Sequence, residues 1–459
     1  MSAPARLSPR TRPSLHTRPS PRTRLSALAV AVAACLGAQA AAALPAAASA
    51  PVVSRGVTIP AFYTPPSTLP AADGALVRSE RLPLALSLPG LDGPLPGRAT
   101  RLMYKSTDST GQPVAVTGAY IEPSAAWKRG GPRPLVALAP GTMGQGDQCA
   151  ASLGLEHPLS LNSRTVSVGY EDLAIYRLLA RGVAVVVTDY AGLGATDRLH
   201  TYVNRLDGAH AVLDAVRAAR NLAGASVTAQ SPVGLYGYSE GGGATAAAAE
   251  LQPDYAPDVT LAGTYAGAPP ADLTEVTEAI DGTDLAGALG WAVNGFLQSD
   301  PELAPVADRH LSQKGKAALA DLATMCVGDA ILSYNSAHST AWTTDGSSLS
   351  EVIRAEPALG DFLDRQRIGR TPPASPVRVA TGVNDDLVPH AQARQLAVDW
   401  CREGADVDYA PVVVPQLGRA LLNHLTPLLT DQGAALGWLT DRLAGRPARS
   451  TCGTLPLRP

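Results

Sequence analysis

The chain has 459 residues, of which 46% are hydrophobic and 17% charged, so it can bury a core and is not intrinsically disordered. Its 37 basic and 40 acidic residues give a net charge of −3. Six arginines and no acidic residue lie in the first 50 positions, so removing that segment would lower the charge from −3 to −9. Because an acidic chain without Lys/Arg runs binds nucleic acids poorly, we expect no nucleic-acid partner.

The first 50 residues have the layout of a secretory signal peptide. Arginines up to Arg24 precede an apolar run, Leu25 to Leu44, and small residues at 48–50 close it. We therefore expect residues 1–50 to be removed and the protein to be secreted, either extracellular or periplasmic. An uncleaved membrane anchor is one alternative. Lipid anchoring is another, because Val32-Ala33-Ala34-Cys35 resembles a bacterial lipoprotein cleavage box.

Four cysteines follow this leader. An even number in an exported chain indicates two disulfides, for which three connectivities are possible. We favour Cys149–Cys326 and Cys401–Cys452. The second bridge would close a loop of about fifty residues around His424, worth roughly 4 kcal/mol in loop entropy. None of the four belongs to a Cys-x-x-Cys pair, which argues against a zinc site.

Strand and helix signals alternate along most of the remaining chain. Residues 51–100 are rich in Pro and Gly and are expected to wrap the surface, while 99–105 and 113–121 predict an antiparallel start to a sheet. Further strands are predicted at 134–139, 183–189, 232–237, 259–265, 377–382 and 407–414, and helices at 171–180, 207–222, 241–251, 391–403 and 431–443. This alternation predicts an α/β fold with a mostly parallel, doubly wound sheet.

The alternation lapses between residues 271 and 373, which have the pattern of helices and loops. We expect this stretch to be a helical cap inserted into a core made of residues 51–270 and 374–459. A helix within the cap carries Trp291 and Phe296 among other apolar residues. These two side chains are assigned to the lining of an apolar substrate site, with ordinary packing between cap and core as the alternative.

Gly237-Tyr238-Ser239-Glu240-Gly241 matches the pattern Gly-x-Ser-x-Gly. It follows a predicted strand and precedes an Ala-rich helix, which is the setting of a nucleophile elbow. The turn is too tight for bulky side chains at the flanking positions, and the N–H groups at the helix start favour developing negative charge. We assign Ser239 as the nucleophile. A Gly-rich turn without catalytic meaning is the alternative.

A serine nucleophile needs a base, and the base needs a carboxylate to orient it. With this kind of elbow the order along the chain is Ser, acid, His. Only His390 and His424 follow the strand at 377–382, and His424 falls on the expected loop before the last helix. We therefore assign His424 as the base and Asp385, just after the strand, as the acid. Asp386 is the rival acid.

Two backbone N–H groups should stabilise negative charge on the carbonyl oxygen that reacts with Ser239. One belongs to Glu240, the residue after the nucleophile. The other should lie on the Gly-rich loop 140–146, where Thr142 is our choice. A plain Gly-rich turn is the alternative for this loop.

The assembled motifs resemble the secretory lipase family of α/β hydrolases, which includes the yeast lipase A type and related bacterial secreted lipases. The likeness covers residues 62–447. It rests on Phe62-Tyr63-Thr64-Pro65-Pro66, Tyr104-Lys105-Ser106-Thr107-Asp108, Pro140-Gly141-Thr142 with Cys149-Ala150-Ala151-Ser152, Asp189-Tyr190-Ala191-Gly192-Leu193-Gly194, Leu213-Asp214-Ala215-Val216-Arg217-Ala218, Gly237-Tyr238-Ser239-Glu240-Gly241-Gly242 and Trp438-Leu439-Thr440-Asp441-Arg442. Pro140 is a departure, because members of the family often have His there.

The resemblance implies hydrolysis of triacylglycerols or shorter acyl esters, with a helical cap, two disulfides and no metal or organic cofactor. By position, Ser239, Asp385 and His424 match the family's triad. The expected partner is an ester or lipid substrate, with transient contact to a lipid interface, and the oligomeric state is not predicted. A carboxylesterase for cell-wall or phenolic esters, a secreted peptidase and a non-catalytic binding protein of the same fold remain alternatives.

Overall fold

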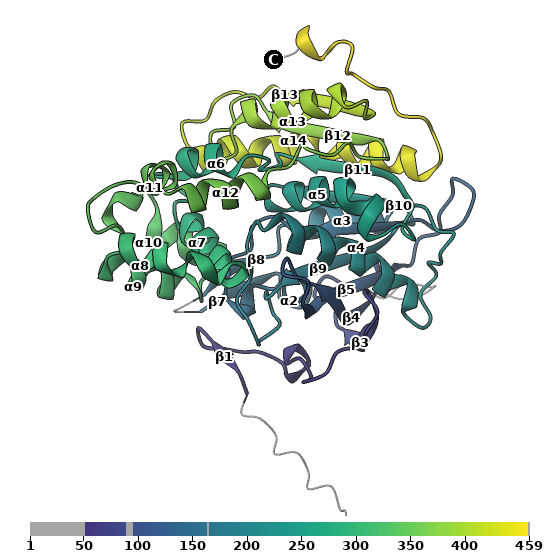
Figure 1. Ribbon diagram of the computed structural model, residues 1–459. Coiled ribbons are helices and arrows are strands. Elements are labelled where there is room, and N and C mark those ends of the chain that lie inside the picture. Colours follow the sequence, from purple (N-terminus) through teal and green to yellow (C-terminus); the bar gives the residue numbers. More distant parts are fainter. Residues whose placement is uncertain (1–50, 89–94, 163–164, 458–459) are drawn as a thin grey trace, which may run out of the picture. The chain divides into compact units, whose positions relative to one another are not determined.

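A nine-stranded sheet is the scaffold of the computed structural model, which describes residues 51–88, 95–162 and 165–457 (Figure 1). The predicted signal peptide and Cys35 lie outside these residues. The strand order is β13-β12-β11-β10-β6-β9-β5-β4-β3. In chain order the strands are β3 (Leu76–Leu82), β4 (Gly97–Thr107), β5 (Pro113–Pro123), β6 (Leu135–Ala139), β9 (Ala184–Ala191), β10 (Val233–Tyr238), β11 (Leu261–Gly267), β12 (Val377–Gly382) and β13 (Val407–Val412).

The strands β6 and β9 to β13 run parallel to their neighbours within that set, whereas β3, β4 and β5 form an antiparallel edge that joins β9. Every residue of β6, β9 and β10 is buried. Strands covered on both faces need no polar alternation, which is why β9 has the continuous apolar run at 184–187. The predicted mostly parallel α/β sheet with an antiparallel start is therefore confirmed.

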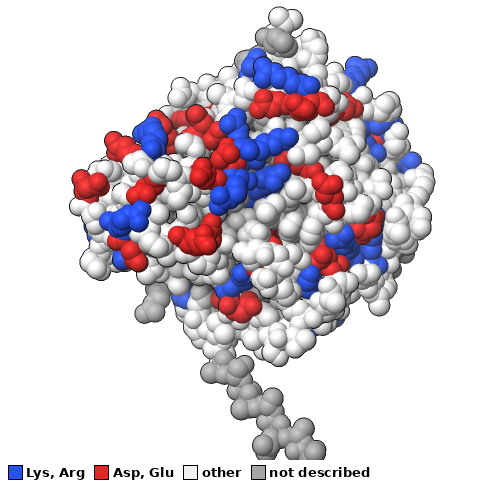
Figure 2. Space-filling view, viewed as in Figure 1, with Lys and Arg blue, Asp and Glu red and all other residues white. Residues whose placement is uncertain are grey.

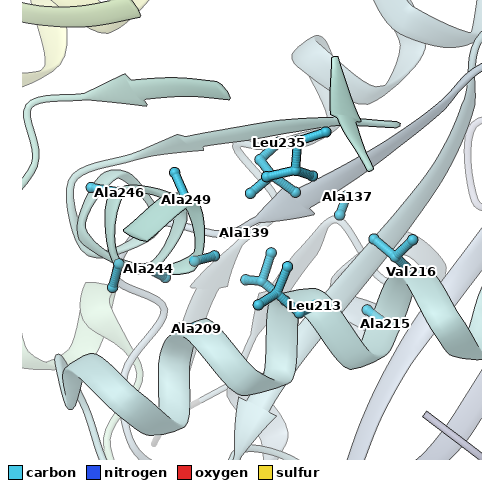
Figure 3. Packing of buried hydrophobic residues seen from close by; sticks show 14 of the residues in the cluster. Ala137, Ala139, Ala209, Leu213, Ala215, Val216, Leu235, Ala244, Ala246 and Ala249 are labelled. Atoms are coloured by element: carbon cyan, nitrogen blue, oxygen red, sulfur yellow. The ribbon is translucent and has the colours of Figure 1, made fainter. Parts of the chain in front are cut away.

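Helices cover both faces of the sheet. One face packs against α4 (Arg205–Asn221), α5 (Glu240–Tyr255) and α13 (His390–Arg402). The other packs against α2 (Ala151–Glu156), α3 (Asp172–Leu179) and α14 (Ala420–Leu443). Small side chains on α4 and α5, such as Ala209 and Ala244, bring these helices close to β6 and β10 (Figure 3). This close packing fixes the start of α5, where Ser239 is located.

The stretch between β11 and β12 is helical. It contains α6 (Leu273–Ile280), α7 (Gly287–Ser299), α8 (Ala304–His310), α9 (Gln313–Leu322), α10 (Val327–Tyr334), α11 (Leu349–Ala355) and α12 (Pro357–Gln366). Figure 1 shows these helices grouped beside one end of the sheet. Residues of α6, α7, α9 and α10 share an apolar cluster with Leu387 and Val388, which follow β12 in the core. These four helices are thus packed onto the segment that carries Asp385.

Two expectations about secondary structure were wrong. Residues 51–100 do more than wrap the surface, because β3 within them pairs with β4 as the edge of the main sheet. The last helix begins at Ala420 instead of Asp431, so His424 lies in its first turns and not on a loop. Pro427 lies inside this helix. Proline lacks an N–H and clashes with the preceding turn, so a helix through this position runs against the local preference.

The structure joins Cys149 to Cys326 and Cys401 to Cys452, the pairing favoured from the sequence. The first bridge connects the segment after β6 to the N-cap residue of α10. The second connects α13 to residues near the C-terminus. Among the described residues, no helix combines the length and the apolar character needed to span a membrane.

Candidate active site

Ser239 occupies the sharp turn between β10 and α5. Its φ is +60°, a backbone conformation that costs energy for a residue with a side chain, and its N–H donates to the Gly267 carbonyl oxygen at 2.9 Å. A Cβ at Gly237 would lie 2.1 Å from the Gly241 oxygen, and one at Gly241 would lie 2.0 Å from the Ala139 oxygen. Glycine is therefore required on both sides of the turn, as the motif predicts.

His424 and Asp385 form a buried hydrogen-bonded pair. The distance from His424 Nδ1 to Asp385 Oδ2 is 2.7 Å, and the side chains are 4% and 0% exposed. The other carboxylate oxygen accepts the N–H groups of Leu387 at 3.1 Å and Val388 at 3.0 Å. This orientation places a proton on Nδ1, so Nε2 is the acceptor in the neutral ring.

The rival residues have different surroundings. Asp386 is exposed, and its Oδ2 accepts a hydrogen bond from Asn423 at 3.2 Å. His390 Nε2 lies 3.0 Å from the Tyr409 hydroxyl oxygen. The structure thus brings together the assigned acid and the assigned base, and it places each rival against a different partner.

The start of α14 is held next to the serine turn. Tyr238, which precedes Ser239, donates its hydroxyl hydrogen to the backbone oxygen of His424 at 2.7 Å. Its ring lies 5.2 Å from the imidazole, centroid to centroid. Ser239 and His424 both line one cavity, although they are 185 positions apart in the chain.

That cavity has a volume of about 40 Å³. Apart from Ser239, Glu240, His424, Thr277 and Tyr202, its walls are apolar. They are formed by Val203, Pro270, Leu273, Val276, Ile280, Leu285, Ala288, Leu289, Ala292, Phe296, Leu387 and Val388. The helices α6 and α7 supply more than half of this apolar lining, so the segment 271–373 contributes to the walls of the cavity that contains Ser239.

A second cavity, of about 80 Å³, lies among the helices α6, α7, α8, α11 and α12. It is lined almost entirely by apolar side chains, with Thr277 and His310 as the polar exceptions. Thr277, Leu289, Ala292 and Phe296 line both cavities. These four residues therefore form a shared wall, which we call the neck.

The two aromatic residues predicted to contact substrate differ in position. Phe296 is part of the neck and packs against Phe362 at 4.8 Å between ring centroids. Trp291 does not fit the prediction, because it is fully buried and lines neither of these cavities. Its indole N–H donates to the Leu322 oxygen at 2.8 Å, and its ring packs edge-on against Tyr202. On a helix that is apolar on most sides, the sequence does not reveal which face lines a cavity.

The loop after β6 is held by buried polar groups. The Tyr190 hydroxyl donates to the Pro140 oxygen at 2.6 Å. A Glu171 carboxylate oxygen accepts the Gly141 N–H at 2.9 Å. Burial raises the pKa of Glu171 to about 7, against a partly compensating effect of that hydrogen bond. The loop is thus fixed partly by a carboxyl group that titrates near neutral pH.

Thr142, the predicted second N–H donor, is held by two tyrosines. Its backbone oxygen accepts the Tyr170 hydroxyl at 3.1 Å, and its own hydroxyl lies 2.8 Å from the Tyr202 hydroxyl. Glu240 is the first residue of α5 and lines the cavity beside Ser239. The assignment of the Thr142 and Glu240 N–H groups to an oxyanion hole stays a prediction.

Several polar residues around the site were not found from the sequence. Tyr170 and Glu171 are neighbours in the chain, Tyr202 comes from another segment, and the three form no motif of their own. His200, whose contacts are described below, is equally isolated in the chain. Among the described residues, no three His, Cys, Asp or Glu side chains cluster as metal ligands would.

The sheet order, the serine turn and the histidine–aspartate pair beside it define an α/β hydrolase of the lipase-like ester hydrolase class. The secretory lipase family matches residues 155–451. This chain belongs to that family, which confirms the resemblance inferred from the motifs.

Relatives in the family include enzymes and a protein named inactive. A probable inactive lipase of Mycobacterium tuberculosis is 31% identical over 391 residues, 84% of this chain and 82% of that protein. The secreted triacylglycerol lipase LIP3 of Malassezia restricta is 28% identical over 390 residues, 84% of this chain and 79% of that protein. Because one relative is named inactive, the hydrolytic activity of this chain has to be tested by assay.

Solved structures agree on the fold. Candida antarctica lipase A superposes with a TM-score of 0.72 at 20% identity, covering 85% of this chain and 87% of that one. The rice cell wall degrading esterase LipA from Xanthomonas oryzae gives a TM-score of 0.65 at 19% identity, covering 82% of this chain and 100% of that one. At these identities the likeness establishes the α/β-hydrolase fold and not the substrate.

Proposed function

We propose that this protein is a secreted serine carboxylic ester hydrolase, a triacylglycerol lipase or lipase-like esterase, with Ser239, His424 and Asp385 as its triad. The observation that carries the proposal is the pairing of His424 Nδ1 with Asp385 at 2.7 Å in a cavity that His424 shares with Ser239. A histidine oriented in this way can take a proton from a serine hydroxyl and return it to a leaving alcohol.

The reaction proceeds by acyl transfer. Ser239 attacks the ester carbonyl while His424 takes its proton, and the N–H groups of Glu240 and Thr142 stabilise the resulting oxyanion. The alcohol leaves with a proton from His424. Water activated by His424 then releases the acid and restores the serine. Asp385 holds the imidazole in its tautomer and stabilises the imidazolium. No cofactor enters these steps.

The cavity walls favour an apolar acyl group. The apolar walls of the cavity that contains Ser239 and of the second cavity behind the neck are built from Leu, Ile, Val, Ala and Phe side chains. By contrast, Figure 2 shows Lys and Arg interspersed with Asp and Glu on the visible surface, and pairs such as Arg365–Asp300 join them. We assign residues 271–373 as the cap, the acyl group to the space beneath it, and the lipid interface as a transient contact.

Relatives and cysteines support export. The Malassezia relative is named a secreted lipase, and this chain has two disulfides, which persist in oxidising compartments. The leader 1–50 would direct this export. N-terminal sequencing of protein recovered from the culture medium tests it, because a cleaved leader gives an N-terminus near residue 50 and a lipid anchor would retain Cys35 on cells.

The activity test uses the exported chain with p-nitrophenyl esters of two to eighteen carbons. Ser239→Ala should lower kcat by about 10⁴ or more, whereas the exposed Ser226→Ala should not. Asp385→Asn should lower kcat by roughly 10³–10⁴ because it leaves His424 in the wrong tautomer. Asp386→Asn and His390→Gln are the matched controls for the acid and the base.

The outcomes separate the alternatives. Ser239-dependent hydrolysis that is fastest on long chains supports a lipase. Ser239-dependent hydrolysis of short or phenolic esters only supports a carboxylesterase. Full activity in Ser239→Ala would exclude the proposed nucleophile. If the wild type hydrolyses no ester and is not labelled by a fluorophosphonate at Ser239, the chain is a non-catalytic member of the fold. If Ser239 is labelled but no ester is hydrolysed, a peptidase is favoured.

A further inference from the structure

Glu240, directly after Ser239, has a buried histidine as its partner. Its Oε1 lies 2.8 Å from His200 Nε2, and the side chains of His200 and Glu240 are 3% and 5% exposed. The other ring nitrogen, His200 Nδ1, lies 3.1 Å from the carbonyl oxygen of Ala191, the last residue of β9. The loop between β9 and α4 thus delivers a histidine to the residue that follows the nucleophile.

These distances fix where the protons are. A backbone carbonyl can only accept, so His200 Nδ1 must carry a hydrogen and donate it to Ala191. Nε2 and Oε1 are both acceptors unless one of them holds a proton, and at 2.8 Å a proton must lie between them. The pair is therefore either an imidazolium with a carboxylate or a neutral imidazole with a carboxylic acid. Its net charge is zero in both forms.

The His200–Glu240 pair lies next to the site of the proposed reaction. Glu240 lines the cavity that contains Ser239 and His424, and on its other side it lines a smaller cavity together with His200. Ester hydrolysis places a negative charge on the carbonyl oxygen beside Ser239, so an unshielded carboxylate on the next residue would oppose it. In a buried site this repulsion is much stronger than in water.

We propose that His200 is a positioning residue that shares a proton with Glu240 and thereby removes negative charge from beside the oxyanion formed at Ser239. This role rests on the proposed ester hydrolysis. It also explains how an acidic residue is tolerated in the Gly-Tyr-Ser-Glu-Gly turn, where its backbone N–H is assigned to the oxyanion.

The aromatic groups around the pair do not supply a positive charge that would offset the Glu240 carboxylate. The Tyr190 ring stacks on His200 at 5.6 Å and the Tyr202 ring meets it edge-on at 5.9 Å. Burial raises the pKa of both phenols, and that of Tyr170, far above the ordinary value, so all three stay neutral. Tyr170 and Tyr190 also feel the charge of Glu171, the other buried carboxyl group nearby.

One cation lies close, at the start of α4. Arg205 lines the smaller cavity with His200, but its guanidinium is paired with Glu250 at 2.7 Å. His424 faces Glu240 across the larger cavity and is already bonded to Asp385. His200 is thus the group in direct contact with the Glu240 carboxyl.

The test is a double-mutant cycle on kcat for p-nitrophenyl butyrate. His200→Gln leaves the Glu240 carboxyl without its shared proton, and kcat should fall by about 10- to 100-fold, as a unit charge near the oxyanion implies. Glu240→Gln should cause a smaller loss, because its amide can donate to His200 Nε2. The double variant, which carries no carboxylate, should regain most of what His200→Gln lost.

A purely structural hydrogen bond predicts the opposite, since removing both partners would be at least as harmful as removing one. A double variant no faster than His200→Gln, or His200→Gln with wild-type kcat, would overturn the proposal.

Two further measurements keep the result interpretable. Urea unfolding midpoints identify a variant that does not fold. If His200→Gln does not fold, the double variant is compared with Glu240→Gln, because His200 should matter little to kcat once the carboxylate is gone. A double variant far slower than Glu240→Gln overturns the proposal. Esterase activity that persists in Ser239→Ala would instead refute the proposed function, not the role of His200.

Discussion

Ala292 is the position at which the acyl site can be tested most directly. It is the smallest of the four neck residues that line both the cavity at Ser239 and the cavity among the cap helices. Ala292→Phe would place a phenyl ring between the two spaces. We expect esters with long acyl chains to lose activity while acetate and butyrate esters keep most of theirs, because short chains fit within the first cavity.

The magnitude follows from the apolar cavity beyond the neck. That cavity is the larger of the two, about 80 Å³ against 40 Å³ at the serine, so the carbons of a long acyl chain that pass the neck are buried among apolar side chains there. Each methylene removed from an apolar site costs about 0.8 kcal/mol. Loss of only three methylenes costs roughly 2.4 kcal/mol, which corresponds to about 60-fold in kcat/KM.

The assay is the ratio of kcat/KM for p-nitrophenyl palmitate to that for p-nitrophenyl butyrate. Ala307→Phe is the matched control, because Ala307 lines only the cavity beyond the neck. It should shift the preferred chain length to a smaller extent than Ala292→Phe. A wild-type ratio in Ala292→Phe, or an equal loss on both esters, would refute the placement of the acyl chain through the neck.

Two predictions concern stability. Replacing both Cys401 and Cys452 by Ser opens a loop with a sequence separation of 51. This should lower the free energy of unfolding, measured by urea titration, by about 4 kcal/mol. A loss below about 1 kcal/mol would show that the loop is already restricted in the unfolded chain. Burial raises the pKa of Glu171 from 4.5 to about 7, so the folded state binds more protons than the unfolded state between these values and stability falls as the pH rises through them. Glu171→Gln should flatten that fall and gain about 3 kcal/mol above pH 7 relative to wild type, and an unchanged pH dependence would contradict this.

The sequence predicted the elements whose signals are local. The β-branched run of β9 and the Gly-rich turn around Ser239 indicate one structure each, because burial on both faces and close backbone contacts leave few other choices. Long-range requirements explain the errors. Pro427 locally disfavours a helix, yet α14 runs through it and packs its buried face on the sheet. Tertiary packing outweighed the local penalty there.

In the candidate site, too, some residues are revealed by local sequence signals and others only by tertiary contacts. Ser239, Asp385 and His424 could be assigned from motif order, and the structure places the last two in contact. His200 and Glu171 could not, because each acts through a partner that is distant in the chain and belongs to no recurring spacing. Trp291 and Phe296, five residues apart on one helix, differ in role because of the helix orientation, which depends on how α7 packs against α9.

The contact between the loop after β6 and the start of α10 limits how substrate can enter. Met143 and Gln145 exchange backbone hydrogen bonds with Val327 and Met325, at 2.8 and 2.9 Å, and the Cys149–Cys326 bridge lies at the same place. Segment 271–373 is therefore joined covalently to the rest of the chain at three places, its two chain ends and this bridge. A segment fixed at three separate places cannot rotate as one rigid body about a single hinge. If the proposed substrate site is correct, we expect substrate to enter by displacement of single helices or side chains, and reduction of Cys149–Cys326 to allow the segment to move as one body.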